Sequence, residues 1–316
     1  SDINIKDKFL DNDIKFYFYP LNLGLNIYRD LLSLVSLIRI IFKSSPDIVH
    51  TFDTKPNIYG RLAAKICNVK IIIGTQPGLG MVFSKYKPVF GSIGRLLFKM
   101  LVKLISSISS MTIYQNMSDL KFMRKEKVVY DKNSTTIISS GVDTNFYKNT
   151  KKNKVNTPLI SEDSINIVFI ARLTISKGTI FYCELAKQIR QDFPNVNFNI
   201  IGEIPQDSPD KVDEEIFIKY KDDINFLGKV SNTKKVLSEA NLMVFPSFFT
   251  EGVPRVLLEA ASMSLPIVAF DNPGSNEVVV DNFNGYLVPV GDMKLLEKSV
   301  LNLLKDENTY SKFCKN

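Results

Sequence analysis

The chain has 316 residues, which exceeds one ordinary domain, so two domains are the first expectation. An apolar content of 45% with mixed charge describes a folded protein and excludes a disordered one. Three scattered cysteines and a single histidine argue against a disulfide framework and against a His-ligated metal site. These residues fit a reducing compartment, so we expect a cytoplasmic α/β protein without a metal. The longest apolar runs are too short to span a bilayer.

The net charge of +7 is unevenly distributed. Residues 1–150 hold 21 Lys and Arg against 11 Asp and Glu, a net charge of +10, whereas residues 151–316 carry −3. Residues 54–118 contain nine basic side chains and no acidic one. Such a basic face attracts nucleic acid or an anionic membrane surface, and a solvated lysine-rich surface is the alternative. No ribonucleoprotein motif, KH loop or zinc knuckle accompanies the charge, so we expect no nucleic-acid partner.

In the first half of the chain, short apolar runs alternate with segments of helical periodicity. The expected strands are 47–50, 70–75, 111–114 and 135–139, and the expected helices are 23–42, 57–66 and 90–107. A polar, lysine-rich stretch at 147–163 resembles a linker. We therefore predict an N-terminal domain over 1–150 and a C-terminal domain over 151–316.

The segment 92–107 has a wide apolar face, with cations at four-residue spacing on another face. The apolar side chains are Ile93, Leu96, Leu97, Met100, Leu101, Leu104 and Ile105, and the cations are Arg95, Lys99 and Lys103. This pattern is typical of an interfacial helix that rests on anionic lipid. It is equally typical of a helix whose apolar face packs on its own sheet. The sequence leaves both interpretations open.

Beyond the linker the alternation of strands and helices is regular. The expected strands are 165–171, 196–201, 224–227, 242–245, 267–270 and 285–288, and the expected helices are 178–191, 213–221, 233–240, 254–263, 275–280 and 294–304. Alternating β and α units predict a parallel sheet covered on both faces. Two such Rossmann-like domains, facing each other across a cleft, would bind a ligand at the carboxyl ends of their strands.

The stretch 246–261 is the most informative part of the chain. Pro254 suits the first turn of a helix, which places Glu251 at the helix mouth and Glu259 inside the helix. The free amides around Gly252 and Val253 form an anion site at the helix N-terminus. Carboxylates accept hydrogen bonds from sugar hydroxyls, and an amide cluster holds a diphosphate. The combination predicts a sugar nucleotide as ligand.

Two further strand-to-helix turns carry candidate residues. Arg172 and Lys177 follow the first strand of the second half and could offset the charge of a departing diphosphate, a role that replaces a divalent metal. A solvated basic loop is the simpler interpretation of this pair alone. The turn with Gly274 and Glu277 places a carboxylate at another helix mouth, and a plain turn with an N-cap would explain it equally well.

These motifs together resemble the retaining GT-B glycosyltransferases of family 4. The resemblance rests on the Glu-x7-Glu block, the Ala-Arg-Leu…Lys-Gly loop, the Pro-Gly…Glu turn and 284–289 (Asn-Gly-Tyr-Leu-Val-Pro). In the first half, 46–60, 78–80 (Gly-Leu-Gly), 115–119 and 141–143 look like the branch that extends polyprenyl-linked surface glycans. The resemblance implies a metal-independent transferase that moves a hexose or N-acetylhexosamine from a UDP-sugar with retention of configuration. The acceptor would be a polyprenyl-diphosphate-linked glycan at the inner membrane face, and no cofactor is expected.

The resemblance also implies residue roles. Lys177, Arg172 and Glu251 would be catalytic, and His50 is the sole imidazole available on the acceptor side. A strand-end histidine bonded to its neighbours is the alternative for His50. The donor would be bound by Gly252, Val253, Pro254, Glu259, Gly274 and Glu277, and the acceptor side would include Gly78, Gly80, Asn116 and Asp119.

Two alternatives and one departure accompany this hypothesis. A UDP-sugar epimerase of similar two-domain shape would need several acid/base residues, which a single histidine disfavours. A non-catalytic sugar-nucleotide or lipid-binding subunit is the other alternative. Relatives in the family begin with a strand, a Gly-rich turn and a helix, whereas this sequence opens near the end of a second strand. We therefore expect the N-terminal domain to lack its first strand–helix unit.

Overall fold

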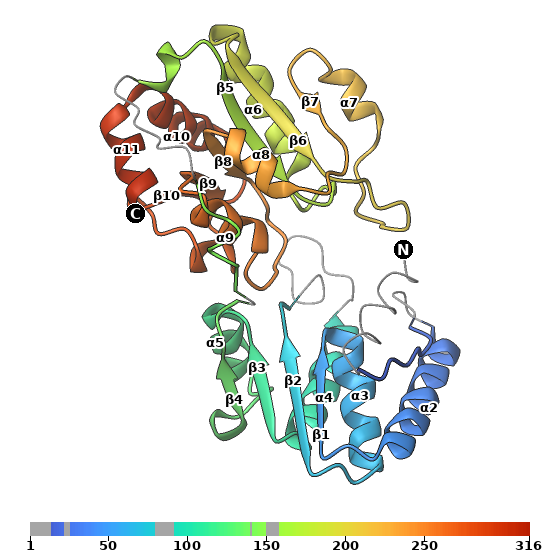
Figure 1. Ribbon diagram of the computed structural model, residues 1–316. Helices are drawn as coiled ribbons and strands as arrows, with labels where there is room; N and C mark the ends of the chain where they lie inside the picture. Colours follow the sequence, from blue (N-terminus) through green and yellow to red (C-terminus); the bar gives the residue numbers. More distant parts are fainter. Residues whose placement is uncertain (1–13, 22–25, 80–91, 140, 150–157) are drawn as a thin grey trace. The chain divides into compact units, whose positions relative to one another are not determined.

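The computed structural model describes residues 14–21, 26–79, 92–139, 141–149 and 158–316. Its contacts divide the chain into two compact units (Figure 1). Unit 1 comprises 1–76, 90–114 and 120–136, and unit 2 comprises 77–89, 115–119 and 137–316. Two short segments from the first half of the sequence thus belong to unit 2. The units are defined by contacts and are not continuous in sequence, so they do not test the predicted boundary at residue 150, which remains a prediction.

Unit 1 contains a four-stranded parallel sheet in the order β1-β2-β3-β4. Helix α2 packs on α3, and α3 packs on α4 and on the first two strands. The elements are α2 (Ile27–Ser44), β1 (Ile48–Phe52), α3 (Thr54–Ile66), β2 (Ile71–Gln76), α4 (Ser92–Ser107), β3 (Met111–Tyr114), α5 (Met117–Lys125), η2 (Asp131–Asn133) and β4 (Ser134–Thr136). The first three residues of α5, 117–119, belong to unit 2. The alternation of parallel strands and helices confirms the α/β class.

Unit 2 contains a six-stranded parallel sheet in the order β10-β9-β8-β5-β6-β7. Helix α6 packs against α10. The elements before β8 are η3 (Leu159–Ser161), β5 (Ile165–Ile170), α6 (Thr179–Asp192), β6 (Val196–Ile201), α7 (Glu215–Lys219), β7 (Asn225–Phe226) and α8 (Thr233–Glu239). The others are β8 (Leu242–Phe245), α9 (Arg255–Ser262), β9 (Ile267–Phe270), η4 (Ser275–Glu277), β10 (Gly285–Val288), α10 (Met293–Lys305) and α11 (Glu307–Lys315).

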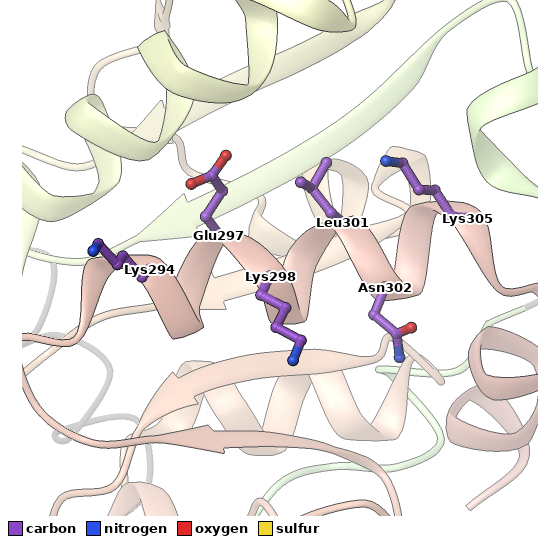
Figure 2. Close-up of a pocket in the computed structure, with 6 residues that line it drawn as sticks. All are labelled: Lys294, Glu297, Lys298, Leu301, Asn302 and Lys305. Carbon is purple, nitrogen blue, oxygen red and sulfur yellow. The ribbon is translucent and has the colours of Figure 1, made fainter.

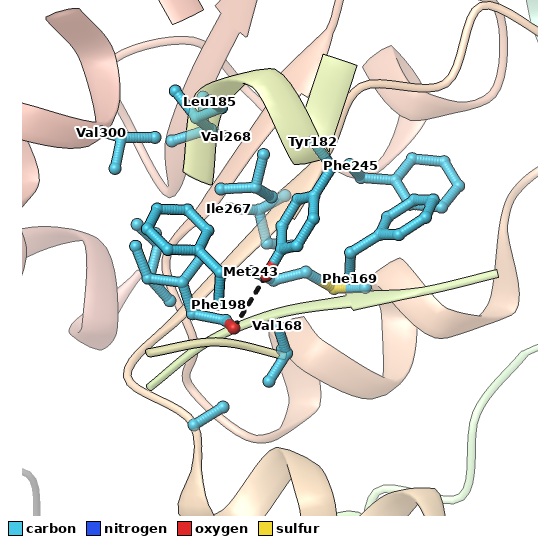
Figure 3. Close-up of a cluster of buried hydrophobic side chains, with 14 of the residues drawn as sticks. Val168, Phe169, Tyr182, Leu185, Phe198, Met243, Phe245, Ile267, Val268 and Val300 are labelled. Atoms are coloured by element: carbon cyan, nitrogen blue, oxygen red, sulfur yellow. Dashed lines mark hydrogen bonds between the residues drawn. The ribbon is translucent and has the colours of Figure 1, made fainter. Parts of the chain in front are cut away.

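The core of unit 2 is built from the central strands and from helices that cover them. All four residues of β8 and of β9 are buried, as expected for parallel strands covered on both faces. Figure 3 shows Tyr182 of α6 reaching into this core, where its hydroxyl donates to the Ile167 carbonyl at 2.8 Å. Its ring stacks on Phe169, with 5.2 Å between the ring centroids. Burial raises the Tyr182 pKa well above its ordinary value, so the phenol stays a neutral donor.

The structure corrects several local expectations, among them the following three. The helix expected over 275–280 is a single 3₁₀ turn, because Asn284 takes the Val280 amide at 2.8 Å and donates to the Val278 carbonyl at 2.9 Å. Pro254 is the N-cap of α9, with an extended ψ of 116°, so the helix begins one residue later. The strand expected over 135–139 ends at Thr136.

Most of the described large apolar side chains of α4 are exposed rather than packed on the sheet of unit 1. Among the described side chains at the apolar positions of this helix, Ile105 alone is buried, with 2% exposure. Five others are between 37% and 61% exposed: Leu96, Leu97, Met100, Leu101 and Leu104. Positions at this spacing lie on one side of a helix, so they form one apolar face, which we call the α4 face.

Candidate functional site

The loops that follow β5 and β8 bring together Lys177 and Glu251. The Lys177 Nζ lies 2.5 Å from a Glu251 carboxylate oxygen, and both side chains are largely buried, with 10% and 24% exposure. The Phe248 amide donates to the Ser176 carbonyl at 2.9 Å, which ties the two loops together. A Cβ on Gly178 would lie 2.0 Å from the Pro246 carbonyl oxygen, so only glycine permits this approach. Two of the four predicted catalytic residues therefore form one ion pair at the carboxyl ends of neighbouring strands.

An aromatic ring and an amide complete the surroundings of Lys177. The Lys177 Nζ lies 4.9 Å from the centre of the Phe249 ring, within cation–π range. Asn272 donates from its side-chain amide to the Phe249 carbonyl at 2.6 Å. The turn after β9 thus fixes the loop after β8. Sequence reasoning did not assign Asn272 a role, although its place before the Pro-Gly turn was visible.

Asp210 is a further residue that the sequence analysis missed. Its carboxylate accepts hydrogen bonds from the Ser176 amide, at 3.2 Å, and from the Ser176 hydroxyl. Thr174 and Lys211 form an isolated antiparallel bridge beside it. The segment 204–213 therefore holds the Lys177 loop from the side. No pattern in the sequence distinguishes this aspartate from the other acidic residues of a polar loop.

Glu259 lies in the middle of α9 and is buried, with 8% exposure. One of its carboxylate oxygens is 3.7 Å from an Arg255 guanidinium nitrogen, and the other accepts from the Thr233 hydroxyl at 3.5 Å. Both contacts are long, so the carboxylate retains acceptor capacity for a ligand. Arg172 is exposed at the start of the β5–α6 loop.

Three glycines from separate motifs meet where their backbones pack too closely for any side chain. A Cβ on Gly78 would lie 2.6 Å from the Gly252 nitrogen, and one on Gly252 would lie 1.8 Å from the Pro77 carbonyl oxygen. A Cβ on Gly274 would lie 1.7 Å from the Gly252 carbonyl oxygen. Val253 and Pro254 are buried beside them. The structure thus gives a steric reason for glycine in three predicted motifs, while Gly80 lies outside the described residues.

The predicted residues Asn116, Asp119 and Glu277 all take part in hydrogen bonds at the start of α5, and Asn116 also contacts the Glu251 loop. Asn116 donates to the Asp119 carboxylate at 2.8 Å and to the Glu251 carbonyl at 3.3 Å. The Met117 amide donates to the Glu277 carboxylate at 2.7 Å. Burial raises the pKa of Asp119 to about 6, against the hydrogen bonds from Asn116 and the Leu79 amide, and Glu277 adds to the rise.

His50 lies in unit 1, at the exposed face of β1. Its Nε2 is 2.8 Å from the Thr75 hydroxyl, and its ring lies against Phe52 with 4.3 Å between centroids. Desolvation and the Arg61 charge lower the pKa of His50, so the ring is neutral near pH 7. The bonded-neighbour interpretation and a role toward an acceptor are both compatible with this environment.

No group of three or more His, Cys, Asp and Glu residues within the described ranges is arranged to hold a metal ion. Among those residues, no helix combines the length and apolar character needed to cross a bilayer. Figure 2 shows a hollow on the exposed side of α10, lined by Lys294, Glu297, Lys298, Leu301, Asn302 and Lys305. It contains none of the candidate residues.

The fold is that of the GT-B glycosyltransferases. Residues 150–316 match the family described as glycosyl transferases group 1, and residues 6–117 match the glycosyl transferase 4-like family. The first match covers more than half of the chain, so this protein belongs to the glycosyl transferases group 1 and is a glycosyltransferase. The predicted family, fold and enzyme class are confirmed, and the epimerase alternative is not favoured.

Relatives and solved structures extend over nearly the whole chain. A "UDP-Gal:alpha-D-GlcNAc-diphosphoundecaprenol alpha-1,3-galactosyltransferase" of Escherichia coli is 27% identical over 98% of this chain and 80% of its own length. An "N,N'-diacetylbacillosaminyl-diphospho-undecaprenol alpha-1,3-N-acetylgalactosaminyltransferase" of Campylobacter jejuni is 24% identical over 93% of this chain and 77% of the relative. The Anabaena protein Alr3699/HepE, solved with UDP, has a TM-score of 0.76 at 18% identity, covering 98% of this chain and 82% of that one.

Proposed function

We propose that this enzyme transfers a hexose or an N-acetylhexosamine from a UDP-sugar to a polyprenyl-diphosphate-linked glycan, with retention of anomeric configuration. The observation that carries the proposal is the Lys177–Glu251 pair at the carboxyl ends of β5 and β8, within a group 1 glycosyltransferase. The names of two relatives support this donor and acceptor class. The donor is supported further by structural neighbours solved with UDP and with UDP-glucose.

The donor occupies the loops of unit 2. Glu259 accepts hydrogen bonds from the ribose hydroxyls, because its long contacts to Arg255 and Thr233 leave acceptor capacity. The amides of Gly252 and Val253 cap the diphosphate, and Pro254 shapes the loop although it has no N–H to donate. Gly274 permits the close approach that holds the Gly252 peptide.

The chemistry is electrostatic. The bond between the anomeric carbon and the β-phosphate oxygen breaks, and the electron pair leaves with UDP. Lys177 and Arg172 stabilise that departing charge. The acceptor oxygen bonds to the same face of the sugar, and its proton passes to the leaving phosphate oxygen. Glu251 contacts the transferred sugar, and its contact with Lys177 keeps the carboxylate and the cation side by side at the reacting end of the donor.

The acceptor is handled by the first half of the chain. His50 lies at an exposed position of β1, with a neutral ring that can bond to a hydroxyl. Gly78, Gly80, Asn116 and Asp119 stay predictions as acceptor-side residues.

An anionic membrane surface, at the cytoplasmic face of the membrane, is the third partner in this proposal. The α4 face exposes five large apolar side chains, and Lys103 is exposed on the same helix. The sequence around this helix carries cations without acids over 54–118, which complements an anionic bilayer. The enzyme would thereby meet a lipid-linked acceptor without crossing the bilayer.

Vesicle sedimentation tests the membrane partner. We expect the protein to sediment with phosphatidylglycerol vesicles and far less with phosphatidylcholine vesicles. The pair Leu97→Ser and Met100→Ser should abolish sedimentation, whereas Ile218→Ser, at a 71% exposed position of unit 2, should not. This part of the proposal is overturned if the double variant sediments as the wild type does. It is also overturned if gel filtration shows that the wild type is a dimer and that the two changes dissociate it.

Two measurements test the reaction. Calorimetry should detect UDP binding that is unchanged by EDTA. Radiolabel should pass from a UDP-sugar into an undecaprenyl-diphosphate-linked glycan fraction. Interconversion of the sugar without acceptor would indicate an epimerase, and binding without transfer would indicate a non-catalytic subunit. Either result contradicts the proposal.

A further inference from the structure

Asn116 does more than begin a helix. It is the residue before α5, and its side-chain oxygen accepts from the Asp119 amide at 2.6 Å, which is an ordinary N-cap contact. Capping needs only that oxygen, so serine or aspartate would serve equally well. Asn116 additionally uses its amide nitrogen as a donor, at 2.8 Å to the Asp119 carboxylate and at 3.3 Å to the Glu251 carbonyl. This donation by the amide nitrogen is not part of helix capping.

The surroundings hold this amide in a fixed orientation. Asn116 is fully buried and Asp119 is 2% exposed, so neither exchanges its partners for water. The Asp119 carboxylate accepts one amide hydrogen of Asn116 and also receives a bond from the Leu79 amide. With its oxygen and one hydrogen committed to Asp119, the other hydrogen of Asn116 is directed to the Glu251 peptide.

The Glu251 peptide is held on other sides as well. Gly78 and Gly274 pack their backbones against residues 251–252 too closely for any side chain. Glu277 accepts from the Met117 amide at 2.7 Å, which ties the turn after β9 to the start of α5. The carbonyl that Asn116 binds therefore belongs to a loop that neighbouring segments of unit 2 hold on several sides. The carboxylate of the same residue lies 2.5 Å from Lys177.

We propose that Asn116 is a positioning residue whose side-chain amide fixes the Glu251 peptide and thereby the Glu251 carboxylate beside Lys177. This assignment differs from a role in acceptor binding. Its consequence for turnover rests on the proposed function, in which Glu251 contacts the transferred sugar. The carbonyl contact itself does not depend on that function.

The variant Asn116→Ser separates the two roles, because serine keeps the N-cap acceptor and removes the amide donor. Asn232→Ser is the matched control, since Asn232 caps α8 of the same unit by accepting from the Lys235 amide at 3.2 Å. A neutral hydrogen bond contributes about 0.5–1.5 kcal/mol, so its loss corresponds to a factor of about 2 to 10 in an equilibrium.

Hydrogen exchange followed by mass spectrometry measures the mobility of the Glu251 loop without any ligand. We expect the amides of residues 250–253 to exchange about 2 to 10 times faster in Asn116→Ser than in the wild type, which is the factor expected for one lost hydrogen bond. The amides of α9 should exchange at the wild-type rate in this variant, and Asn232→Ser should leave exchange at 250–253 unchanged. Unaltered exchange at 250–253 in Asn116→Ser overturns the inference, whether or not the protein binds nucleotide.

Calorimetry then tests whether the Glu251 carboxylate is still positioned to bind the sugar of the donor. The donor is the one used in the transfer assay, chosen from UDP-galactose, UDP-glucose and UDP-N-acetylgalactosamine. In Asn116→Ser, the affinity for UDP should stay within about twofold of the wild type, whereas the affinity for this UDP-sugar should fall about 2- to 10-fold. Equal weakening of UDP and UDP-sugar would indicate general damage and overturns the positioning role. A wild type that binds no UDP overturns the proposed function instead, and the exchange experiment still decides this inference.

Discussion

The two units differ in how completely they bury their strands. In unit 2, β8 and β9 are buried at every position, and the described core includes side chains from α6, α9, α10 and α11. In unit 1, β1 buries one residue of five and β2 buries three of six. The described part of unit 1 also leaves α2 and α4 with several exposed large apolar side chains.

This difference matches the work that we assign to each unit. A close-packed interior deforms little, so loops anchored on β5 and β8 can hold Lys177 and Glu251 within hydrogen-bond distance. Exposed apolar side chains stabilise a fold little, but they are available for contact with another surface. Unit 2 thus has the properties of a rigid site, and unit 1 those of a docking element.

The largest expected effect compares the same side chain in the two sheets. Phe198 of β6 is fully buried, so Phe198→Ala should lower the free energy of unfolding by about 3–5 kcal/mol. Phe52 of β1 is 55% exposed, and Phe52→Ala should cost about 1 kcal/mol, mainly the contact with His50. Urea denaturation followed by circular dichroism measures both. Equal losses would contradict the contrast between the units.

The next effect concerns the ion pair of unit 2. Lys177→Ala should lower kcat by a factor of about 10²–10³, because a preorganised charge facing the leaving group is lost. UDP binding should fall much less. Lys229→Ala is the control, since Lys229 forms an exposed pair with Glu203 at 2.8 Å. Wild-type turnover in Lys177→Ala would exclude this lysine from the reaction.

The pH dependence of stability tests the buried carboxyl of unit 2. Burial raises the pKa of Asp119 from 3.8 to about 6, so between these values the folded protein binds more protons than the unfolded chain. Stability contributed by this group is therefore full below pH 4 and is lost as the pH rises through 6, by about 3 kcal/mol at most.

The variant Asp119→Asn isolates that contribution. Its side chain keeps an acceptor oxygen for the Leu79 amide but does not titrate, so this part of the pH dependence should disappear. Urea denaturation of both proteins at pH 4, 5, 6 and 7 measures the difference. A wild type and a variant with parallel stability curves would show that Asp119 does not titrate in this range.

Sequence patterns predicted most strands, and they did so for a physical reason. Runs such as β8 and β9 are apolar throughout because both sheet faces are covered, and this signal is local. The helix α5 was missed, because it has only nine residues and more than half of them are polar. The 3₁₀ turn at Ser275 was mistaken for a helix, because the competing bonds come from Asn284.

The candidate site was predictable only where chemistry and motif coincide. Lys177 and Glu251 lie 74 positions apart, yet the motifs indicated both, and the structure pairs them. Asp210 and Asn272 support this pair through backbone contacts that depend on the three-dimensional course of the loops. Such supporting residues have no characteristic spacing, so the sequence does not reveal them.

The smallest effect concerns donor affinity in unit 2. Glu259→Gln keeps the size of the side chain and removes its charge, so the ribose loses a charge-assisted acceptor. Hydrogen bonds to charged groups contribute about 1.5–3 kcal/mol, and UDP affinity measured by calorimetry should fall about 10- to 100-fold. Glu239→Gln, at an exposed position of α8, should bind UDP like the wild type. Because the core of unit 2 is well buried without this side chain, the loss of UDP affinity should be accompanied by a fall in the free energy of unfolding of no more than about 1 kcal/mol. Unchanged UDP affinity in Glu259→Gln would remove this carboxylate from the donor site and leave the amides of Gly252 and Val253 as the remaining contacts.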